Sequence, residues 1–198
     1  MCGRQRRRPS ENSKSKAPPS RSKVLAYEAR GDALTRELKF AEAIACYTEA
    51  LKENPGHMPG YVGRGYAYFY NGDHDKALAD FTKAIELSPN SAGNYTARGS
   101  VHRAKGDFKK AIADQTAALR VKPDSGAAYK ERCLARAQSG QGKAAIRDCT
   151  KAIALMPDVA APYEARGYAH MRVKSYALAI ADFDKALEPI PVDVNRGA

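Results

Sequence analysis

The side chains best suited to chemistry in this 198-residue sequence are four cysteines and four histidines. Thiols and imidazoles hold zinc when they cluster, as in C-x-x-C pairs, and a neighbouring cysteine and histidine can form a nucleophile with its base. The residues are Cys2, Cys46, Cys133, Cys149, His57, His74, His102 and His170. No C-x-x-C pair and no compact cluster appears among them. We therefore expect neither a zinc site nor a disulfide framework, but reduced, buried thiols in a cytoplasmic protein.

Other catalytic motifs are also missing from the sequence. No Ser/His/Asp arrangement, Cys/His arrangement or H-E-x-x-H helix is present, and the glycines at 60, 63 and 65 do not follow a predicted strand, as a dinucleotide-binding loop would require. We expect a protein without catalysis, cofactor or metal.

The positive charge of the chain is concentrated at its N-terminus. The formal net charge is +11, and residues 1–23 contribute +7 of it, which leaves +4 for the rest. The basic residues of this segment are Arg4, Arg6, Arg7, Arg8, Lys14, Lys16, Arg21 and Lys23, opposed by Glu11 alone. Such a segment can neutralise phosphates on nucleic acid or on an anionic membrane, although it can equally be a solvated terminus. The body of the protein is too weakly basic to indicate a nucleic-acid binder.

Composition separates the basic segment from a folded body. Residues 1–23 are rich in Arg, Lys, Ser and Pro and nearly lack large apolar side chains, so we expect them to be disordered. They contain no apolar region typical of a secretory signal, although a wrongly assigned start codon could hide one. The remaining chain has no apolar run long enough to span a membrane. A cytoplasmic location is therefore the expectation.

From Val24 onward the sequence repeats with a period of 34 residues. Tyrosine recurs at 27, 61, 95, 129 and 163, and arginine at 30, 64, 98, 132 and 166. Glycine follows each arginine except Arg132, where Cys133 stands instead. Two alanine columns, beginning at Ala43 and Ala50, and a proline column beginning at Pro55 keep the same period. A fixed period of this length indicates stacked structural repeats.

Each period carries the pattern of two helices. Apolar residues recur at intervals of three and four, as in Ala77, Leu78, Phe81 and Ala84. Gly72-Asp73 and Gly106-Asp107 predict a left-handed residue that ends the first helix, followed by an N-capping aspartate. The proline column ends each second helix. One hairpin cannot bury its apolar face alone, so neighbouring hairpins must stack.

A helix-turn-helix of 34 residues with these columns resembles the tetratricopeptide repeat, most plainly in Tyr61, Gly65, Ala77, Phe81, Ala84 and Pro89. The resemblance covers residues 24–193 as five units: 24–57, 58–91, 92–125, 126–159 and 160–193. Residues 1–23 form a basic tail and 194–198 a C-terminal tail. The departures are Gln115 and Cys149 in the aromatic column and Leu38 in place of a turn glycine. The implied fold is all-α, a right-handed α-solenoid of ten helices.

This resemblance implies that the first helix of each unit lines a concave groove in which a partner peptide or helix docks. One branch of the family clamps the terminal carboxylate of a chaperone with Lys, Asn and Arg side chains. At the first two clamp positions this sequence has Glu28 and Asp32, and the later positions are Gly63, Gly93 and Ala97. Shifting the register by one or two repeats does not restore the clamp. The chain therefore does not resemble the carboxylate-clamp branch.

By helical phase, eleven residues are expected to face the groove. They are Glu28, Asp32, Tyr66, Phe69, Tyr70, Arg103, Lys130, Glu131, Tyr168, Met171 and Arg172. Three of them, Tyr66, Phe69 and Tyr70, are aromatic and additional to the column tyrosine, so they could anchor an apolar partner side chain. They could instead pack against neighbouring repeats. The expected function is that of a non-catalytic adaptor for an unidentified protein, with polyanion tethering through the basic tail as the alternative.

Two further patterns bear on structure. Four arginines of the column are followed sixteen residues later by aspartate (Arg64/Asp80, Arg98/Asp114, Arg132/Asp148 and Arg166/Asp182), which predicts a repeated ion pair. The last repeat is followed by a short, proline-broken segment that cannot form a capping helix. Ile180, Phe183 and Leu187 are therefore expected to be partly exposed, and weak self-association could cover them.

Overall fold

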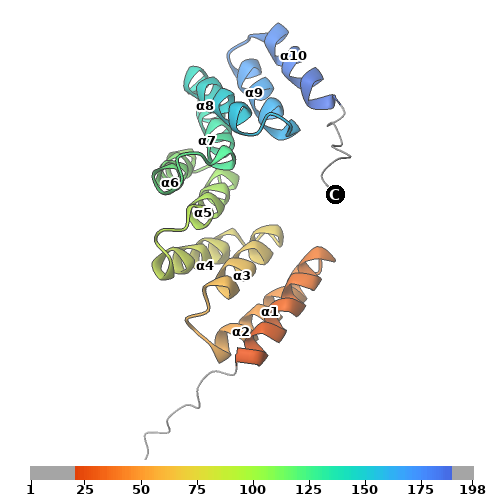
Figure 1. Ribbon diagram of the computed structural model, residues 1–198, viewed down its shortest axis with the longest axis vertical. Coiled ribbons are helices and arrows are strands. Elements are labelled where there is room, and N and C mark those ends of the chain that lie inside the picture. Colours follow the sequence, from red (N-terminus) through yellow and green to blue (C-terminus); the bar gives the residue numbers. More distant parts are fainter. Residues whose placement is uncertain (1–20, 189–198) are drawn as a thin grey trace, which may run out of the picture.

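The computed structural model describes residues 21–188, and these form ten α-helices without a strand in that range. The helices are α1 (Arg21–Arg36), α2 (Phe40–Glu53), α3 (Met58–Tyr70), α4 (His74–Leu87), α5 (Ala92–Ala104), α6 (Phe108–Val121), α7 (Gly126–Gln138), α8 (Gly142–Leu155), α9 (Ala160–Arg172) and α10 (Tyr176–Leu187). Consecutive helices pair into five hairpins that follow one another along the long axis (Figure 1). The all-α expectation of five helix-turn-helix repeats is confirmed.

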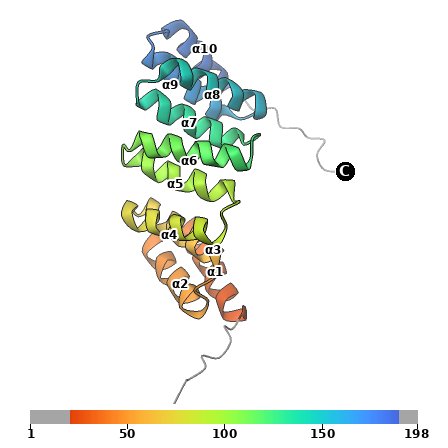
Figure 2. The same cartoon turned by 90° about the vertical axis from the view of Figure 1, so that its left-hand side faces the viewer.

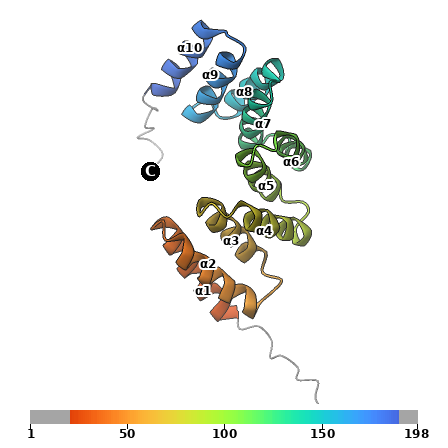
Figure 3. The same cartoon turned by 180° about the vertical axis from the view of Figure 1, so that it is seen from behind.

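The hairpins form a curved stack. Seen from the side, they lie one above another from α1 and α2 at the bottom to α9 and α10 at the top (Figure 2). The two ends of the stack, α1 and α10, lie toward the same side, on the right in Figure 1 and on the left in Figure 3. Helices α4 and α6 lie on the outer side of the curve in both views, and α3 and α5 lie nearer its inner side.

The turn inside each hairpin has the same geometry in all five repeats. Residues 38, 72, 106, 140 and 174 have φ of 60°, 87°, 79°, 83° and 63°, the left-handed region that favours glycine. The next residue donates its amide to a carbonyl five positions earlier, as Asp73 does to Tyr68 at 2.9 Å. The first and last repeats adopt this conformation without glycine, at Leu38 and Lys174.

The aspartates that follow the turn glycines behave differently from each other. Asp107 accepts a hydrogen bond from the backbone N–H of Lys110 at 3.2 Å, as an N-cap should. Asp73 makes no such bond, and its carboxylate instead accepts from the Asn71 amide at 3.1 Å. Both aspartates thus occupy the expected N-cap position, and the capping hydrogen bond forms at Asp107 but not at Asp73.

The arginine and aspartate columns form the predicted ion pairs. Arg64 donates through Nε and Nη2 to both carboxylate oxygens of Asp80, each at 2.8 Å. Arg98/Asp114, Arg132/Asp148 and Arg166/Asp182 form the same two-pronged contact. The aspartates are buried, with 5–6% of each exposed. These pairs therefore join the two helices of a repeat as buried contacts, not as exposed surface pairs.

A threonine column extends each ion pair to the preceding repeat. Arg64 Nη1 donates to the hydroxyl of Thr48 on α2 at 3.2 Å, while its other nitrogens hold Asp80 on α4. Thr82, Thr116 and Thr150 accept from the following arginines in the same way, at 3.2–3.4 Å. One guanidinium group thus connects the two helices of its own hairpin and also links that hairpin to the preceding one.

The ends of the described chain differ in part from expectation. Helix α1 begins at Arg21, three residues before the expected repeat start. Residues 1–20, with the basic side chains from Arg4 to Lys16, and residues 189–198 lie outside the described residues. Ile180 and Leu187 are 61% and 82% exposed, as expected, and Phe183 is half-buried. Self-association through this face stays a prediction. None of the helices within residues 21–188 is long and apolar enough to cross a membrane.

Candidate functional site

A cavity of about 850 Å³ lies between the first two repeats and brings together four of the residues predicted for the groove. Glu28 and Asp32 come from α1, and Tyr66 and Tyr70 come from α3. The rest of the lining consists of Thr35, Arg36, Tyr47, Met58, Pro59, Val62, Gly63 and Asn94. Helix α3 thus contributes apolar and aromatic side chains, and α1 contributes two carboxylates together with the guanidinium of Arg36.

The aromatic wall is held in place from behind. The Tyr66 ring packs edge-on against buried Phe81, with centroids 5.1 Å apart, and stacks against Tyr70 at 6.4 Å. Phe40 stacks on Tyr70 at 5.7 Å. Tyr66 and Tyr70 are still 38% and 59% exposed. These rings therefore have a fixed orientation and a free face, which is the condition for an anchor residue.

Phe69, the third aromatic residue predicted for the groove, has a different role. It is half-buried and packs against the core formed by Ala77, Phe81, Ala97 and Val101. It does not line the cavity. Adjacent positions on one helix point in directions about 100° apart, so Phe69 turns inward while Tyr70 faces out.

The acidic wall is ordered by hydrogen bonds. Tyr47 donates its hydroxyl to Asp32 at 2.7 Å, and His57 Nε2 lies 2.9 Å from a carboxylate oxygen of Glu28. Burial raises the pKa of Tyr47 to about 12, and the carboxylates of Asp32 and Glu28 act in the same direction. Tyr47 is therefore a neutral donor at physiological pH. Sequence reasoning missed it because it belongs to the aromatic column, where a core position was expected.

The charged residues predicted for the middle of the groove pair with one another. Arg103 on α5 donates to Glu131 on α7 at 3.2 Å, and Lys130 contacts the same carboxylate at 2.9 Å. Burial raises the pKa of Tyr66, with smaller contributions from Tyr70 and the Glu131 carboxylate. The cluster of Arg103, Lys130 and Glu131 therefore lies within electrostatic reach of the aromatic wall.

The three remaining predicted residues lie on α9 and do not line the cavity. Tyr168 is half-buried against the core between α7 and α9, whereas Met171 is 47% exposed and Arg172 is also exposed. The eleven predicted residues thus divide into a cavity, an ion cluster, one core residue and a separate C-terminal group.

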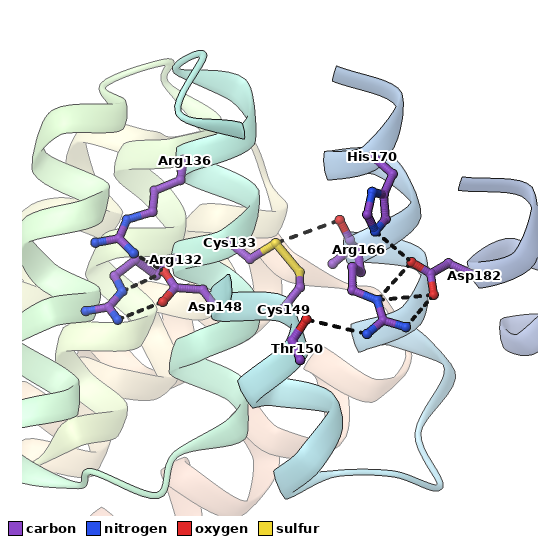
Figure 4. The surroundings of a disulfide bond; sticks show 10 residues. Arg132, Cys133, Arg136, Asp148, Cys149, Thr150, Arg166, His170 and Asp182 are labelled. Atoms are coloured by element: carbon purple, nitrogen blue, oxygen red, sulfur yellow. Dashed lines mark hydrogen bonds and ion pairs between the residues drawn. A yellow bond between two sulfur atoms is a disulfide. The ribbon is translucent and has the colours of Figure 1, made fainter. Parts of the chain in front are cut away.

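The cysteines of the fourth repeat contradict the expectation of reduced thiols. Cys133 on α7 and Cys149 on α8 form a disulfide, with an S–S distance of 2.06 Å and a Cα–Cα distance of 5.4 Å (Figure 4). Both residues are fully buried. The two chain segments meet because sixteen residues separate facing positions in every hairpin. Cys46 is free and half-buried. Within residues 21–188, no group of three or more His, Cys, Asp or Glu side chains is placed to hold a metal ion.

Comparison with known proteins agrees with the architecture. Profiles of the tetratricopeptide repeat match residues 24–57, 59–91 and 92–125, which together make up just over half of the sequence. No curated protein sequence matches the chain significantly.

Solved structures resemble the chain over most of its length. A crystal structure of the MamA protein is 25% identical, with a TM-score of 0.69 over 84% of this chain and 91% of its own. A thermophilic tetratricopeptide-repeat protein from Thermus thermophilus is 23% identical, with a TM-score of 0.73 over 86% and 93%. Cut9, in a hetero-tetramer with Hcn1, is 19% identical, with a TM-score of 0.77 over 84% and 33%. With the repeat columns, the five hairpins and the profile matches, these likenesses show that the chain belongs to the tetratricopeptide-repeat family.

Proposed function

We propose that the protein is a non-catalytic scaffold that binds a segment of another protein on its inner face, with the cavity between α1 and α3 as the main anchor. The observation that carries this proposal is the pair of ordered, exposed rings of Tyr66 and Tyr70 in a cavity of about 850 Å³. Large aromatic side chains in preformed hollows dominate the energy of many protein interfaces. Cut9, whose fold is similar to that of this chain, forms a hetero-tetramer with Hcn1, which is consistent with a role in binding another protein.

The chemistry of the acidic wall suggests the partner's side chain. Glu28 and Asp32 stand one helical turn apart, where the carboxylate-clamp branch would have Lys and Asn. The charge at these two positions is inverted, and with Arg36 also in the lining the α1 side keeps an excess of one negative charge, so the site favours a cation over a carboxylate. An arginine or lysine could place its charge between the two carboxylates and its stem across Tyr66, which would add a cation–π contribution. We therefore propose a partner segment with a basic residue beside apolar ones.

Selection from a random peptide library on the full-length protein tests this proposal. Peptides with Arg or Lys next to aromatic or aliphatic residues should be enriched. Their affinity should fall at least tenfold with Tyr66→Ala/Tyr70→Ala and by a smaller factor with Glu28→Gln/Asp32→Asn. Tyr176→Ala is a matched control, since this tyrosine is 60% exposed on α10 and outside the cavity. Enrichment of peptides with acidic C-termini, or equal loss with the control variant, would contradict the proposal.

Tethering to a polyanion through the basic tail is the second candidate function, because +7 of the +11 net charge lies in residues 1–23. Binding to duplex DNA or to anionic vesicles should then weaken steeply with salt and disappear when Arg4, Arg6, Arg7, Arg8, Lys14 and Lys16 are replaced by Gln. Peptide binding in the cavity should survive that replacement, so the two functions are separable.

A further inference from the structure

The disulfide occupies a position that is filled in another way in the other four repeats. In each hairpin a residue on the first helix faces the residue sixteen positions later on the second. The pairs are Gly31/Tyr47, Gly65/Phe81, Gly99/Gln115, Cys133/Cys149 and Gly167/Phe183. A Cβ added to any of the four glycines would lie 2.6–3.0 Å from the facing side chain. In the first, second, third and fifth repeats, a large side chain on the second helix therefore fills the space above a glycine on the first helix, which we call a glycine notch. This contact closes the hairpin. In the fourth repeat, a covalent bond closes it instead.

The surroundings of the bond contain little else that could replace it. The buried core around it consists of Ala137, Ala145, Ala165 and Ala169 together with the two cysteines. Leu134 on α7, Ile146 on α8 and Tyr168 on α9 pack against this core but are only partly buried, so the disulfide is the fully buried contact between α7 and α8 that the short alanine side chains do not replace. Because it closes a loop between residues sixteen positions apart, it also restricts the unfolded chain.

We propose that the Cys133–Cys149 bond is a redox-sensitive closure of the fourth repeat, which holds its tight packing only in the oxidised form. Two thiols need more room than one disulfide, because non-bonded sulfur atoms keep a larger separation. Both cysteines are fully buried in the core between α7, α8 and α9, and protein interiors are close-packed, so the larger separation must displace neighbouring groups. Reduction therefore moves α7 and α8 apart.

The loosened state keeps a polar connection between the helices. Arg132 holds both carboxylate oxygens of Asp148 at 2.8 Å, and Arg136 donates to the same carboxylate at 2.7 Å (Figure 4). These contacts flank the disulfide and do not depend on it. The reduced hairpin is consequently loosened but not unfolded.

The effect reaches residues outside the hairpin through α7. Cys133 Sγ lies 3.8 Å from the carbonyl oxygen of Ala165 on α9, so the bond is packed against the fifth repeat as well. Helix α7 also carries Glu131, whose carboxylate accepts from Arg103 on α5 and contacts Lys130. Movement of α7 should therefore change the packing on both sides of the fourth repeat.

The reductant that fits this reaction is a dithiol. Its thiolate attacks one sulfur, forms a mixed disulfide and releases one cysteine thiolate, which takes a proton. Its second thiol then closes the reductant's own disulfide and releases the other cysteine, so that two electrons pass from the dithiol to the protein. Because both sulfurs are buried, attack waits for an opening of the hairpin.

The disulfide also fits an oxidising compartment. The prediction of a cytoplasmic location rested in part on reduced thiols, and the disulfide removes that argument for it.

The test uses the full-length protein in a Cys2→Ser/Cys46→Ser background, which prevents disulfide exchange. Addition of dithiothreitol should lower the melting temperature by roughly 6–12 °C, as expected for a loop of this length. Hydrogen exchange of amides in α7 and α8 should rise at least tenfold, while exchange in α3 and α4 stays unchanged. Alkylation and mass spectrometry should count two thiols after reduction and none before it.

Two variants keep the test decisive. Cys133→Gly/Cys149→Phe recreates the pair found in the second and fifth repeats, and its melting temperature and exchange should not respond to the reductant. Cys133→Ala/Cys149→Ala should resemble the reduced protein with or without reductant. The proposal is overturned if the purified protein contains two free thiols at these positions, if reduction leaves exchange in α7 and α8 unchanged, or if the Gly/Phe variant responds to the reductant as the parent does.

Discussion

The second and fourth repeats have the same backbone and different interiors. Their helices are 13 and 14 residues long in both cases, and each turn contains a glycine with φ between 83° and 87°. Both contain an arginine that grips an aspartate at 2.8 Å through two nitrogens. Behind this shared frame, the second repeat is closed by Phe81 against Gly65 and the fourth by the disulfide. The turn and the ion pair thus define the hairpin, and the closure can vary.

The two repeats also differ on the surface that faces the groove. Phe81 supports Tyr66 from behind, so the large closure of the second repeat extends into an exposed aromatic wall. The ring on α7, Tyr129, packs against the core of Ala118, Leu119 and Ala128, and the groove side of the fourth repeat is the ion cluster of Lys130 and Glu131 with Arg103. The two proposals thus assign partner contact to the second repeat and control of packing to the fourth.

The largest expected effect is the loss of the aromatic closure. Phe81 is fully buried, so Phe81→Ala should lower the free energy of unfolding by about 3–5 kcal/mol. Urea denaturation followed by circular dichroism measures this loss. Tyr70→Ala, on a side chain that is 59% exposed, is the control and should cost far less. A loss below about 1 kcal/mol for Phe81→Ala would mean that the glycine notch does not close the second repeat.

The next effect compares the two ion pairs. Asp148 holds Arg132 and Arg136, whereas Asp80 holds Arg64 alone. Removal of either carboxylate leaves a partly buried guanidinium unpaired, so Asp80→Ala should cost about 1–3 kcal/mol and Asp148→Ala should cost more. The same denaturation measurement applies. Equal losses would show that Arg136 adds nothing to the fourth repeat, contrary to the polar support assigned to it above.

A smaller effect distinguishes the first repeat, where Tyr47 takes the place of Phe81. Tyr47→Phe removes the hydrogen bond to Asp32 and should cost about 1 kcal/mol near pH 7. The pKa of Tyr47 is about 12 in the folded protein, against about 10 when unfolded. Between these values the unfolded state loses the proton first, so the stability of the parent should fall relative to the variant as pH rises from 10. A difference between the two proteins that is constant from pH 7 to 11.5 would contradict this.

Sequence reasoning succeeded where a column repeats. The period of 34 predicted five hairpins, and the spacing of sixteen between Arg64 and Asp80 predicted the ion pairs, because the same geometry recurs in each unit. The same spacing separates Cys133 from Cys149. The signal for the disulfide was therefore present, but four isolated cysteines in a chain expected to be cytoplasmic favoured reduced thiols.

The cavity was only partly predictable. The position of a residue along a helix predicts the direction in which its side chain points, but not how deeply neighbouring repeats bury it. Tyr66 and Tyr70 reach the cavity, whereas Phe69 turns into the core. Tyr47 reaches the cavity from a core position, since its hydroxyl extends past Gly63, where an added Cβ would lie 2.5 Å from the ring. Such contacts depend on how neighbouring hairpins pack against each other, and the sequence of a single repeat does not determine that packing.

The smallest expected effect tests the frame that the repeats share. Leu38 adopts the left-handed conformation with φ of 60°, and its side chain is 73% exposed. That conformation costs a non-glycine residue roughly 1–2 kcal/mol. A glycine avoids this cost, but it makes the unfolded chain more flexible, which lowers the stability of the folded state by about 0.4–1 kcal/mol. Leu38→Gly should therefore raise the free energy of unfolding by about 0.5–1 kcal/mol, and Gly72→Ala at the matching position should lower it by about as much. Urea denaturation of both variants measures the change in the free energy of unfolding relative to the parent. The two changes should have opposite signs, because one substitution relieves the strained turn and the other strains it. Changes of the same sign would show that the two turns are not equivalent.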